Sequence, residues 1–222
     1  MTSPVVVLLD VGGVLLLPIA DHIATGLLDW GAKPAGHNDA HVHYAAVASF
    51  DRTGCMHDYR RRYAEMLGVP SELCDDAARS KAFDGPWRRV VPGSAAALRR
   101  LASQHPVVIV SDSDGTVADQ LRQAELAQVG PGDGVEVRGI LDSTHVGAQK
   151  PHPRLFQLAL HMLGAFPEQA VMIGDSVRCD MLGAMGLGIR ALHVTPPGGC
   201  FDPRHDDVAD LTAATALLTS HA

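Results

Sequence analysis

The stretch from Val5 to Leu15, Val-Val-Val-Leu-Leu-Asp-Val-Gly-Gly-Val-Leu, constrains the fold of this chain more than any other part of it. Apolar residues, mostly β-branched, lead directly into Asp10, and two glycines follow shortly after. A continuous apolar run of this length predicts a strand buried on both faces, as in a parallel sheet covered by helices. Because ligands bind at the carboxyl ends of strands in open α/β sheets, Asp10 is the first candidate for a reacting residue.

The composition indicates a globular chain and excludes several classes of protein. Its 222 residues are enough for one sizeable domain, or for a core domain with a smaller insert. The formal net charge of −7 is the opposite of the basic surface that nucleic-acid binding requires, so we predict no nucleic-acid partner. We also predict no membrane partner, because no apolar run is long enough to span a bilayer.

The cysteines and the first residues of the chain bear on its location. The cysteines are Cys55, Cys74, Cys179 and Cys200. They form no C-x-x-C pair, so neither a zinc site nor a disulfide framework is expected. The first four residues include no basic residue ahead of the short apolar run, which is unlike a signal peptide. We therefore expect a reduced, cytoplasmic setting, with the protein a monomer or a homodimer.

Strand and helix signals alternate along the chain after residue 89. Strands are predicted over residues 106–110, 135–141, 170–173 and 190–194. Helices are predicted over residues 95–103, 116–128, 153–163, 180–186 and 210–219, with loops at 130–134 and 195–199. This alternation predicts an α/β fold built on a doubly wound parallel sheet with right-handed crossovers.

The region between the first strand and residue 89 has the apolar spacing of helices instead. Helices are predicted over residues 40–50, 57–67 and 71–82, the last after a helix stop at Gly68 and a new N-cap at Ser71. This excursion is longer than a crossover between two strands needs. We therefore predict a helical subdomain over residues 18–88, inserted into a core domain of residues 1–17 and 89–222.

Polar groups follow three of the predicted strands and are expected to meet at one edge of the sheet. Asp10, Ser111 and Asp175 end strands, and Lys150 precedes a helix. Asp10 and Asp175, with Asp180 one helical turn further on, are hard oxygen ligands suited to Mg²⁺. Ser111 can donate to a phosphate oxygen, and Lys150 can neutralise phosphate and restrain Asp10. Together they suggest covalent phosphoryl transfer to Asp10 followed by hydrolysis.

Four segments carry these residues in an order that resembles the haloacid dehalogenase (HAD) superfamily. The segments are Asp10 to Leu15, Val107 to Ser111, Val146 to Pro153 and Gly174 to Asp180, the last followed by Leu182-Gly183-Ala184. The resemblance covers nearly the whole chain. Within the superfamily, the chain resembles the branch that has a helical cap after the first strand. It implies a Rossmann-like core, Mg²⁺ and, most often, hydrolysis of phosphate esters.

The resemblance assigns roles to the site residues. The catalytic residues are Asp10, Ser111 and Lys150, and substrate contacts fall to Ser111, Asp112 and Lys150. The metal ligands are Asp10, Asp175, Asp180 and, through its backbone carbonyl, Gly12; Asp180 can instead act behind the direct ligands. Gly12 departs from the family, whose phosphatases usually carry a second Asp here to protonate the leaving group. Loss of such an acid typically costs about 10²–10⁴-fold in rate, which a good leaving group such as an anomeric phosphate offsets.

A second segment, Ile109 to Thr116, also resembles the first family motif and has both acids, Asp112 and Asp114. We prefer Asp10 as the nucleophile, because Lys150 follows Asp112 too soon for a further strand and helix. A milder alternative keeps Asp10 and lets Asp112 or Asp114 supply the missing proton transfer. Asp- and Gly-rich loops of this kind are more often simple turns.

The predicted cap contains clusters whose function the sequence leaves open. Its histidines include His37, His41, His43 and His57, which we interpret as scattered surface residues and not as a metal site. Its other notable residues are Tyr44, Arg52, Tyr59, Arg60, Arg61 and Arg62. Arginine-rich helix faces are usually solvated, but one or two of these side chains can read a sugar or a phosphate.

The leading functional hypothesis is a Mg²⁺-dependent phosphatase of a small phosphorylated metabolite, such as a sugar or nucleoside phosphate. The alternative is a catalytically weak HAD-fold protein that binds a ligand or partner, which Gly12 motivates. A dehalogenase ranks lower because it does not use the metal that Asp175 and Asp180 suggest. A phosphonate hydrolase also ranks lower, because the cap offers only Lys33 and Lys81 for a Schiff base.

Overall fold

The structure is a computed structural model that describes residues 5–85, 87–196, 200, 202 and 204–219. The expectation for the first four residues, and residues 197–199 of the predicted loop, lie outside the described residues. The chain forms two compact units, one of Met1–Leu15 and Val90–Ala222 and the other of Leu16–Arg89. We call them the core unit and the inserted unit. Their bounds lie close to residues 1–17 with 89–222 and to residues 18–88, the ranges predicted from the sequence.

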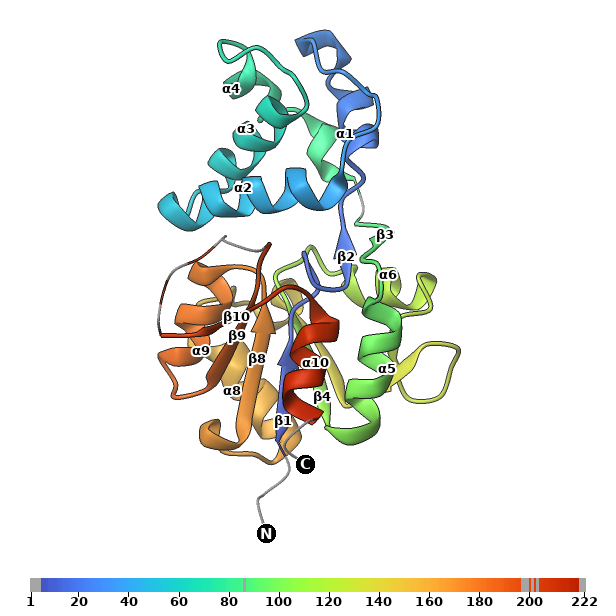
Figure 1. Cartoon of the computed structure of the whole chain (residues 1–222), viewed down its shortest axis with the longest axis vertical. Coiled ribbons are helices and arrows are strands. Elements are labelled where there is room, and N and C mark those ends of the chain that lie inside the picture. Colours follow the sequence, from blue (N-terminus) through green and yellow to red (C-terminus); the bar gives the residue numbers. More distant parts are fainter. Residues whose placement is uncertain (1–4, 86, 197–199, 201, 203, 220–222) are drawn as a thin grey trace. The chain divides into compact units, whose positions relative to one another are not determined.

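The core unit is built on a parallel sheet with the strand order β10-β9-β8-β1-β4-β7 (Figure 1). The strands are β1 (Val6–Leu9), β4 (Val107–Ser111), β7 (Gly139–Asp142), β8 (Ala170–Gly174), β9 (Arg190–Val194) and β10 (Asp206–Val208). After β1 the chain adds strands on one side, and after β7 it returns to add strands on the other. The predicted doubly wound, Rossmann-like α/β fold is confirmed.

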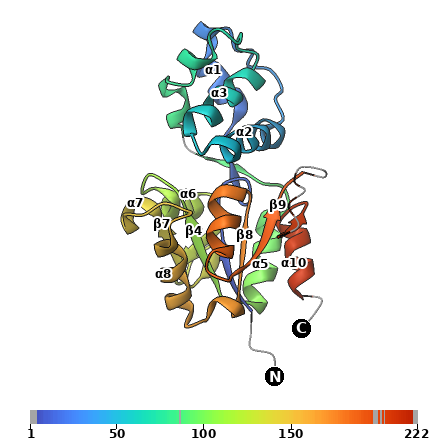
Figure 2. The same ribbon diagram turned by 90° about the vertical axis from the view of Figure 1, so that its left-hand side faces the viewer.

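Helices cover both faces of this sheet, which explains why its strands are continuously apolar (Figure 2). Leu8, Val108 and Met172 pack on one face against α8 and α9, whose buried side chains belong to the same core cluster. Leu9 and Ile109 point to the opposite face and are also fully buried. The helices of the core unit are α5 (Ser94–Gln104), α6 (Val117–Gln123), α7 (Ser143–Val146), α8 (Pro153–Leu163), α9 (Leu182–Met185) and α10 (Leu211–Thr219), with a 3-10 turn at Pro167–Gln169.

The segment predicted as one helix over residues 116–128 is wrong in its second half. Helix α6 ends at Gln123, Glu125 takes a positive φ of 52°, and a short strand β5 (Ala127–Val129) follows. It pairs with β6 (Val135–Val137), so the strand predicted over residues 135–141 is divided into β6 and β7. The amide of Gln128 closes the loop between them by bonding the backbone N–H and C=O of Gly134.

Two further corrections concern the C-terminal part of the core unit. The helix predicted over residues 180–186 begins earlier, with a π-helical turn at Val177–Met181 that leads into α9. The short edge strand β10 was not predicted, because three residues with two adjacent aspartates give no strand signal.

The inserted unit is helical, as predicted, and has its own apolar core. It contains α1 (Ala20–Gly26), α2 (Asp39–Thr53), α3 (Met56–Met66) and α4 (Cys74–Ala77), with 3-10 turns at Leu28–Trp30 and Lys81–Asp84. Two short strands, β2 (Leu16–Leu17) and β3 (Arg89–Val90), pair at its beginning and end. The helix predicted over residues 71–82 is reduced to α4, because Ser71 donates to Glu72 and does not cap a helix.

One histidine of the inserted unit contradicts the expectation of scattered surface residues. His43 is buried, and its Nδ1 lies 3.0 Å from the hydroxyl of Tyr59. Burial lowers the pKa of His43 from 6.5 to about 3, so the ring is neutral at physiological pH. His37 and His57 instead pair with the carboxylates of Asp21 and Asp75.

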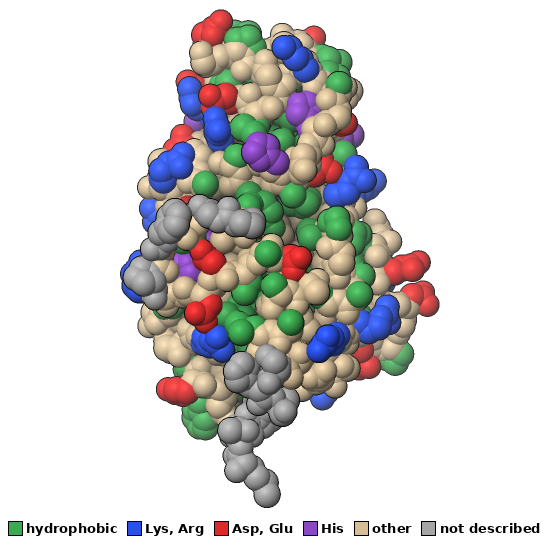
Figure 3. Space-filling model, in the orientation of Figure 1, with side chains coloured by type: hydrophobic (Ala, Val, Ile, Leu, Met, Phe, Trp, Pro, Cys, Tyr) green, Lys and Arg blue, Asp and Glu red, His purple; other side chains and the backbone are tan. Residues whose placement is uncertain are grey.

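The charges on the surface are mixed. On the face seen in Figure 3, lysine and arginine side chains are interspersed with acidic ones over the described part of the chain. Among the described residues, no helix combines the length and the apolar character needed to cross a membrane.

Candidate active site

Asp10 lies at the carboxyl edge of the sheet, directly after its central strand β1. The backbone N–H of Asp10 donates to the carbonyl of Ile173 in β8, so the pairing of the two strands continues one residue beyond β1. This pairing places Asp10 near Asp175, which follows β8. Both side chains are buried, at 6% and 5% exposure. The predicted convergence of strand ends is therefore what the fold produces for these two carboxylates.

Lys150 joins the site through a buried ammonium group. Its Nζ donates to Asp10 Oδ1 and to Asp180 Oδ1, both at 2.7 Å, and to the carbonyl of Val110 at 3.1 Å. Three acceptors match the three N–H bonds of an ammonium, so the position of Nζ is fixed. Burial alone would lower the pKa of Lys150, but the carboxylates of Asp10 and Asp180 outweigh it and hold that pKa well above 10.5. Lys150 therefore remains a cation.

Asp180 is oriented by contacts on both of its carboxylate oxygens. Oδ1 accepts from Lys150, and Oδ2 accepts from the backbone N–H of Ser176 at 3.1 Å. Gly174, the last residue of β8, lies directly against this side chain, and a Cβ at that position would overlap the carboxyl group. Glycine at 174 therefore allows the sheet to approach Asp180 closely.

The three acids fit a magnesium ion. Carboxylate oxygens of Asp10, Asp175 and Asp180 all lie within 4.8 Å of one another, and all three residues are buried. Burial raises the pKa of Asp10 well above its usual value, and the charges of Asp180 and Asp175 add to this while Lys150 opposes it. Clustered carboxylate oxygens are the hard donors that Mg²⁺ prefers.

Ser111 and Asp112 end the neighbouring strand. Ser111 is the last residue of β4 and is buried, while Asp112 follows it at an exposed position. Asp112 Oδ1 accepts from the backbone N–H of Lys150 at 2.9 Å, which ties the Lys150 loop to the end of β4. Asp114 accepts from the N–H and the hydroxyl of Thr116, as in a local turn. The ammonium of Lys150 therefore contacts the side chain of Asp10, whereas the side chain of Asp114 only closes a local turn.

Gly12 lies two residues after Asp10 and is half-buried. It has no side chain that could exchange a proton, so the core unit has no acid at this position. The next residue, Gly13, adopts a positive φ of 65°, which a glycine tolerates best. The chain therefore turns directly after Gly12, where the backbone N–H groups of Val14 and Leu15 both donate to the carbonyl of Val11.

Two supporting residues were not predicted. Asp142, at the end of β7, is buried and accepts from the N–H groups of Gly115 and Thr144, so it holds the loop after β4. His193 in β9 contacts the carbonyl of Asp175 through Nε2 at 3.1 Å. Both residues occur at or near strand ends, which is the only signal the sequence offers for them.

Cys179 lies beside the acids without acting as a nucleophile. Burial raises the pKa of its thiol to about 12, and the charge of Asp180 adds to this. Because the thiolate is the reactive form, Cys179 is unreactive at neutral pH. A carboxylate is therefore the candidate nucleophile.

Comparison with known proteins agrees with this geometry. Residues 5–188 match the model of the haloacid dehalogenase-like hydrolase family. A phosphoserine phosphatase from Thermus thermophilus is 39% identical over 84 residues, which cover 35% of this chain and 34% of that enzyme. The matched segment thus spans about a third of the length of this relative.

Solved structures share the fold over almost the whole chain. A HAD-hydrolase from Bacillus subtilis bound to magnesium aligns with a TM-score of 0.63 at 19% identity, covering 97% of this chain and 98% of its own. A 2-haloacid dehalogenase from Pseudomonas syringae aligns with a TM-score of 0.57 at 21% identity, covering 99% and 100%. With the family model matched over most of its length, the chain belongs to the haloacid dehalogenase-like hydrolases.

Proposed function

We propose that this protein is a Mg²⁺-dependent phosphatase that hydrolyses a small phosphorylated metabolite through a phosphorylated Asp10. The observation that carries the proposal is the Lys150 ammonium, bonded at 2.7 Å to both Asp10 and Asp180 within a buried group of three acids. The phosphatase relative supports the same reaction class for this chain.

The geometry suggests how Asp10 acts. Its Oδ1 is held by Lys150, which leaves Oδ2 to attack the phosphorus atom. A bond then forms between Oδ2 and phosphorus while the bond from phosphorus to the leaving oxygen breaks. Water subsequently cleaves the aspartyl-phosphate and restores the carboxylate. Asp10, Asp175, Asp180 and the carbonyl of Gly12 would hold Mg²⁺, which supplies positive charge to the phosphoryl oxygens.

Ser111 and Lys150 contribute to phosphate binding in this proposal. Ser111 ends the strand next to β1, where its hydroxyl can donate to a phosphoryl oxygen. Lys150 keeps Asp10 oriented and adds positive charge where negative charge develops. Asp112 acts less directly, by holding the backbone N–H of Lys150.

Gly12 directs the choice of substrate. Without an acid at this position, the leaving oxygen departs with little protonation, so substrates with good leaving groups are favoured. Sugar phosphates with the phosphate on the anomeric carbon meet this requirement, whereas simple alkyl phosphates do not. We therefore prefer, among the sugar and nucleoside phosphates, a sugar with its phosphate on the anomeric carbon, because nucleoside phosphates carry theirs on an alkyl oxygen.

Substrate selection is assigned to the inserted unit, which we propose acts as the cap. Several of its arginines are already paired within that unit: Arg60 with Asp84, Arg61 with Asp75 and Arg62 with Glu65. Arg60 also lies 5.6 Å from the ring centre of Phe83. Among the arginines singled out from the sequence, Arg52 is exposed and is therefore the better candidate for contacting the substrate.

Other HAD chemistries fit less well. A phosphonate hydrolase would need a desolvated lysine, and both Lys33 and Lys81 are exposed. A dehalogenase needs no metal, yet Asp175 and Asp180 form an acidic group with Asp10. A protein that binds a phosphorylated ligand without rapid turnover is the second candidate, and Gly12 is the feature that favours it.

Phosphate release tests the proposal. The protein is assayed with an aryl phosphate and a panel of sugar and nucleoside phosphates, with Mg²⁺ and with a chelator. Turnover should require Mg²⁺ and should be abolished in Asp10→Asn, while Asp114→Asn, a matched change at an exposed acid, keeps it. Activity that survives in Asp10→Asn would refute the nucleophile.

The second candidate is separated by restoring the missing acid. A phosphatase adapted to a good leaving group should gain little or lose activity in Gly12→Asp. A gain of about 10²-fold or more on aryl or alkyl phosphates would instead indicate a weakened enzyme whose present role is binding.

A further inference from the structure

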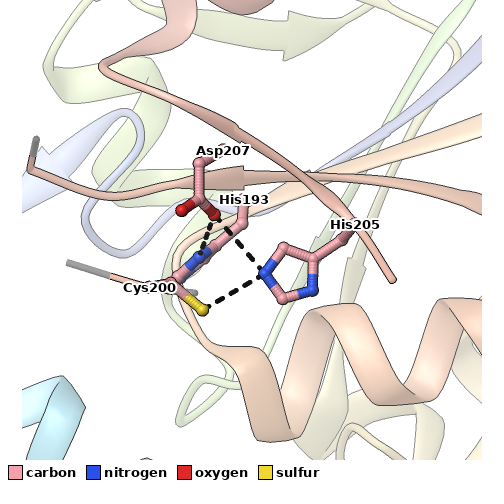
Figure 4. A group of neighbouring side chains, drawn as sticks. All are labelled: His193, Cys200, His205 and Asp207. Carbon is pink, nitrogen blue, oxygen red and sulfur yellow. Dashed lines mark hydrogen bonds and ion pairs between the residues drawn. The ribbon is translucent and has the colours of Figure 1, made fainter. Parts of the chain in front are cut away.

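A second group of metal-binding side chains lies on the other side of the β8 strand end from Asp10. It consists of His193 in β9, Cys200 in the following segment, His205 just before β10, and Asp207 in β10 (Figure 4). One donor atom from each residue lies within 4.8 Å of the others. The figure shows that the two rings, the thiol and the carboxylate converge on one small region.

The strand pairing explains why two of these donors meet. Strands β9 and β10 are parallel, and Asp207 is the register partner of His193. Residues that lie opposite one another in a sheet project to the same face. His205 lies at a bend directly before β10. The sheet therefore places His193 and Asp207, and the side chains of His205 and Cys200 lie next to them.

Two separations between the donors are close to those of a tetrahedral zinc site, and a third is somewhat shorter. Zinc binds sulfur at about 2.3 Å and nitrogen or oxygen at about 2.0–2.1 Å, so a tetrahedron separates S from N by about 3.6 Å and N from O by about 3.4 Å. Cys200 Sγ lies 3.4 Å from His205 Nε2, which lies 3.4 Å from Asp207 Oδ1. His193 Nδ1 lies 3.0 Å from the same Oδ1.

The hydrogen bonds of His193 point independently to a cation. Its Nε2 lies 3.1 Å from the carbonyl oxygen of Asp175, which can only accept, so Nε2 carries the hydrogen. In the neutral ring, Nδ1 then carries only a lone pair and acts as an acceptor, yet it faces the carboxylate of Asp207. Two acceptors face one another unless a cation lies between them or the ring carries a second proton. A backbone carbonyl on the far nitrogen is the usual support of a histidine that binds metal.

We propose that His193, Cys200, His205 and Asp207 form a structural site for a zinc ion. Two imidazoles, a thiolate and a carboxylate complete a tetrahedron, so no position stays open for a substrate or a reactive water. Sulfur and nitrogen donors disfavour Mg²⁺, which separates this site chemically from the all-oxygen group at Asp10. The zinc ion would connect β10, His205 and Cys200 to β9.

The cysteine spacing gave no hint of this site. Zinc motifs are usually recognised by paired cysteines, and this chain has none. Here the ligands have the spacing H-x6-C-x4-H-x-D, and only the pairing of β9 with β10 brings them together. The expectation from sequence that no zinc site exists is therefore replaced by this proposal.

Cobalt substitution tests the site directly. The metal-free protein, held in excess Mg²⁺, is titrated with Co²⁺ and then with Zn²⁺. One equivalent of Co²⁺ should produce a thiolate-to-cobalt charge-transfer band and the strong visible bands of a tetrahedral ion, and Zn²⁺ should displace it. Cys200→Ser should remove the charge-transfer band, and Asp207→Asn should weaken Zn²⁺ binding by at least about 10-fold.

Two matched variants serve as controls. Cys55→Ser changes an exposed thiol of the inserted unit and should leave the band intact. Asp10→Asn alters the acidic group and should also leave it intact. If the wild-type protein gives no charge-transfer band, or if Cys200→Ser and Asp207→Asn both bind Co²⁺ and Zn²⁺ like the wild type, the four side chains form only a hydrogen-bonded group and the proposal is wrong.

Discussion

Replacing Lys150 by methionine tests the electrostatic argument at the candidate active site. Methionine keeps the approximate length of the side chain but removes the ammonium that bonds Asp10, Asp180 and the carbonyl of Val110. Two buried carboxylates then face one another without a positive partner. Breaking a buried ion pair in this way typically costs about 3–5 kcal/mol, so we expect a loss of about 3 kcal/mol at neutral pH without metal.

The pH dependence makes this prediction sharper. Because the folded-state pKa of Lys150 is raised, its stabilising effect is complete below the pKa of the unfolded chain and is lost only at higher, strongly alkaline pH. The wild-type protein has the full effect throughout pH 5.5–8. Burial already raises the pKa of Asp10, and removing Lys150 raises it further. Between the pKa of the unfolded chain and this raised pKa, each unit of pH lowers the stability of the folded protein by about 1.4 kcal/mol. The loss in Lys150→Met should therefore be larger at pH 8 than at pH 5.5.

Urea unfolding monitored by circular dichroism measures the effect, in a chelator and in saturating Mg²⁺. With a slope of about 2 kcal/mol/M, a loss of 3 kcal/mol lowers the midpoint by about 1.5 M. Mg²⁺ should recover part of the loss, because it compensates the same acids. Phosphate release should fall by about 10²–10³-fold even in Mg²⁺.

The matched control is Lys81→Met, which alters an exposed lysine and should change stability by less than about 0.5 kcal/mol. If Lys150→Met unfolds at the same urea concentration as this control, or loses the same stability at both pH values, the reasoning about buried charge is refuted.

Three further predictions follow from individual contacts. Gly174→Ala places a Cβ against the carboxyl group of Asp180 and should lower phosphate release by at least about 10-fold; unchanged activity would mean that the site accommodates it. Because burial lowers the pKa of His43 to about 3, the neutral ring favours the folded state above about pH 6.5, and this stability is lost as pH falls towards 3. His43→Gln should therefore reduce the acid-induced loss of unfolding free energy by about 3 kcal/mol at pH 4.5, as measured by urea unfolding. Iodoacetamide at pH 8 should label the exposed Cys55 and leave Cys179 unmodified, as read by mass spectrometry; rapid labelling of Cys179 would contradict its raised pKa.

The core fold and the acids could be predicted because both follow from short-range patterns. Five apolar residues before Asp10 specify a strand covered on both faces, and a parallel sheet brings the residues after such strands to one edge. The contact of Lys150 with Asp10 spans 140 residues of sequence, and only the resemblance to a known family suggested it. The loop of Lys150 carries no periodicity that would fix its position.

The helix ends were less predictable, because tertiary contacts decide them. The apolar spacing over residues 116–128 favours a helix throughout, yet Gln128 bonds Gly134 and the chain becomes β5. At Ser71 the signal for an N-cap is present, but the hydroxyl donates to Glu72 and α4 starts later. In each segment one polar side chain, Gln128 or Ser71, bonds a partner outside the predicted helix pattern, and local helix propensity does not predict that choice.

The two proposed metal sites also differ in how far the sequence predicts them. Asp10 and Asp175 each follow a long apolar strand, so the sequence alone places them at the edge of the sheet. His193 and Asp207 meet only because β10, a strand of three residues without a strand signal, pairs with β9. The carbonyl of Asp175 accepts from His193, so the second site contacts the backbone of the first. Removing zinc should therefore disturb the Asp175 backbone as well as the edge strand, and a lowered Mg²⁺ affinity in Asp207→Asn would reveal that coupling.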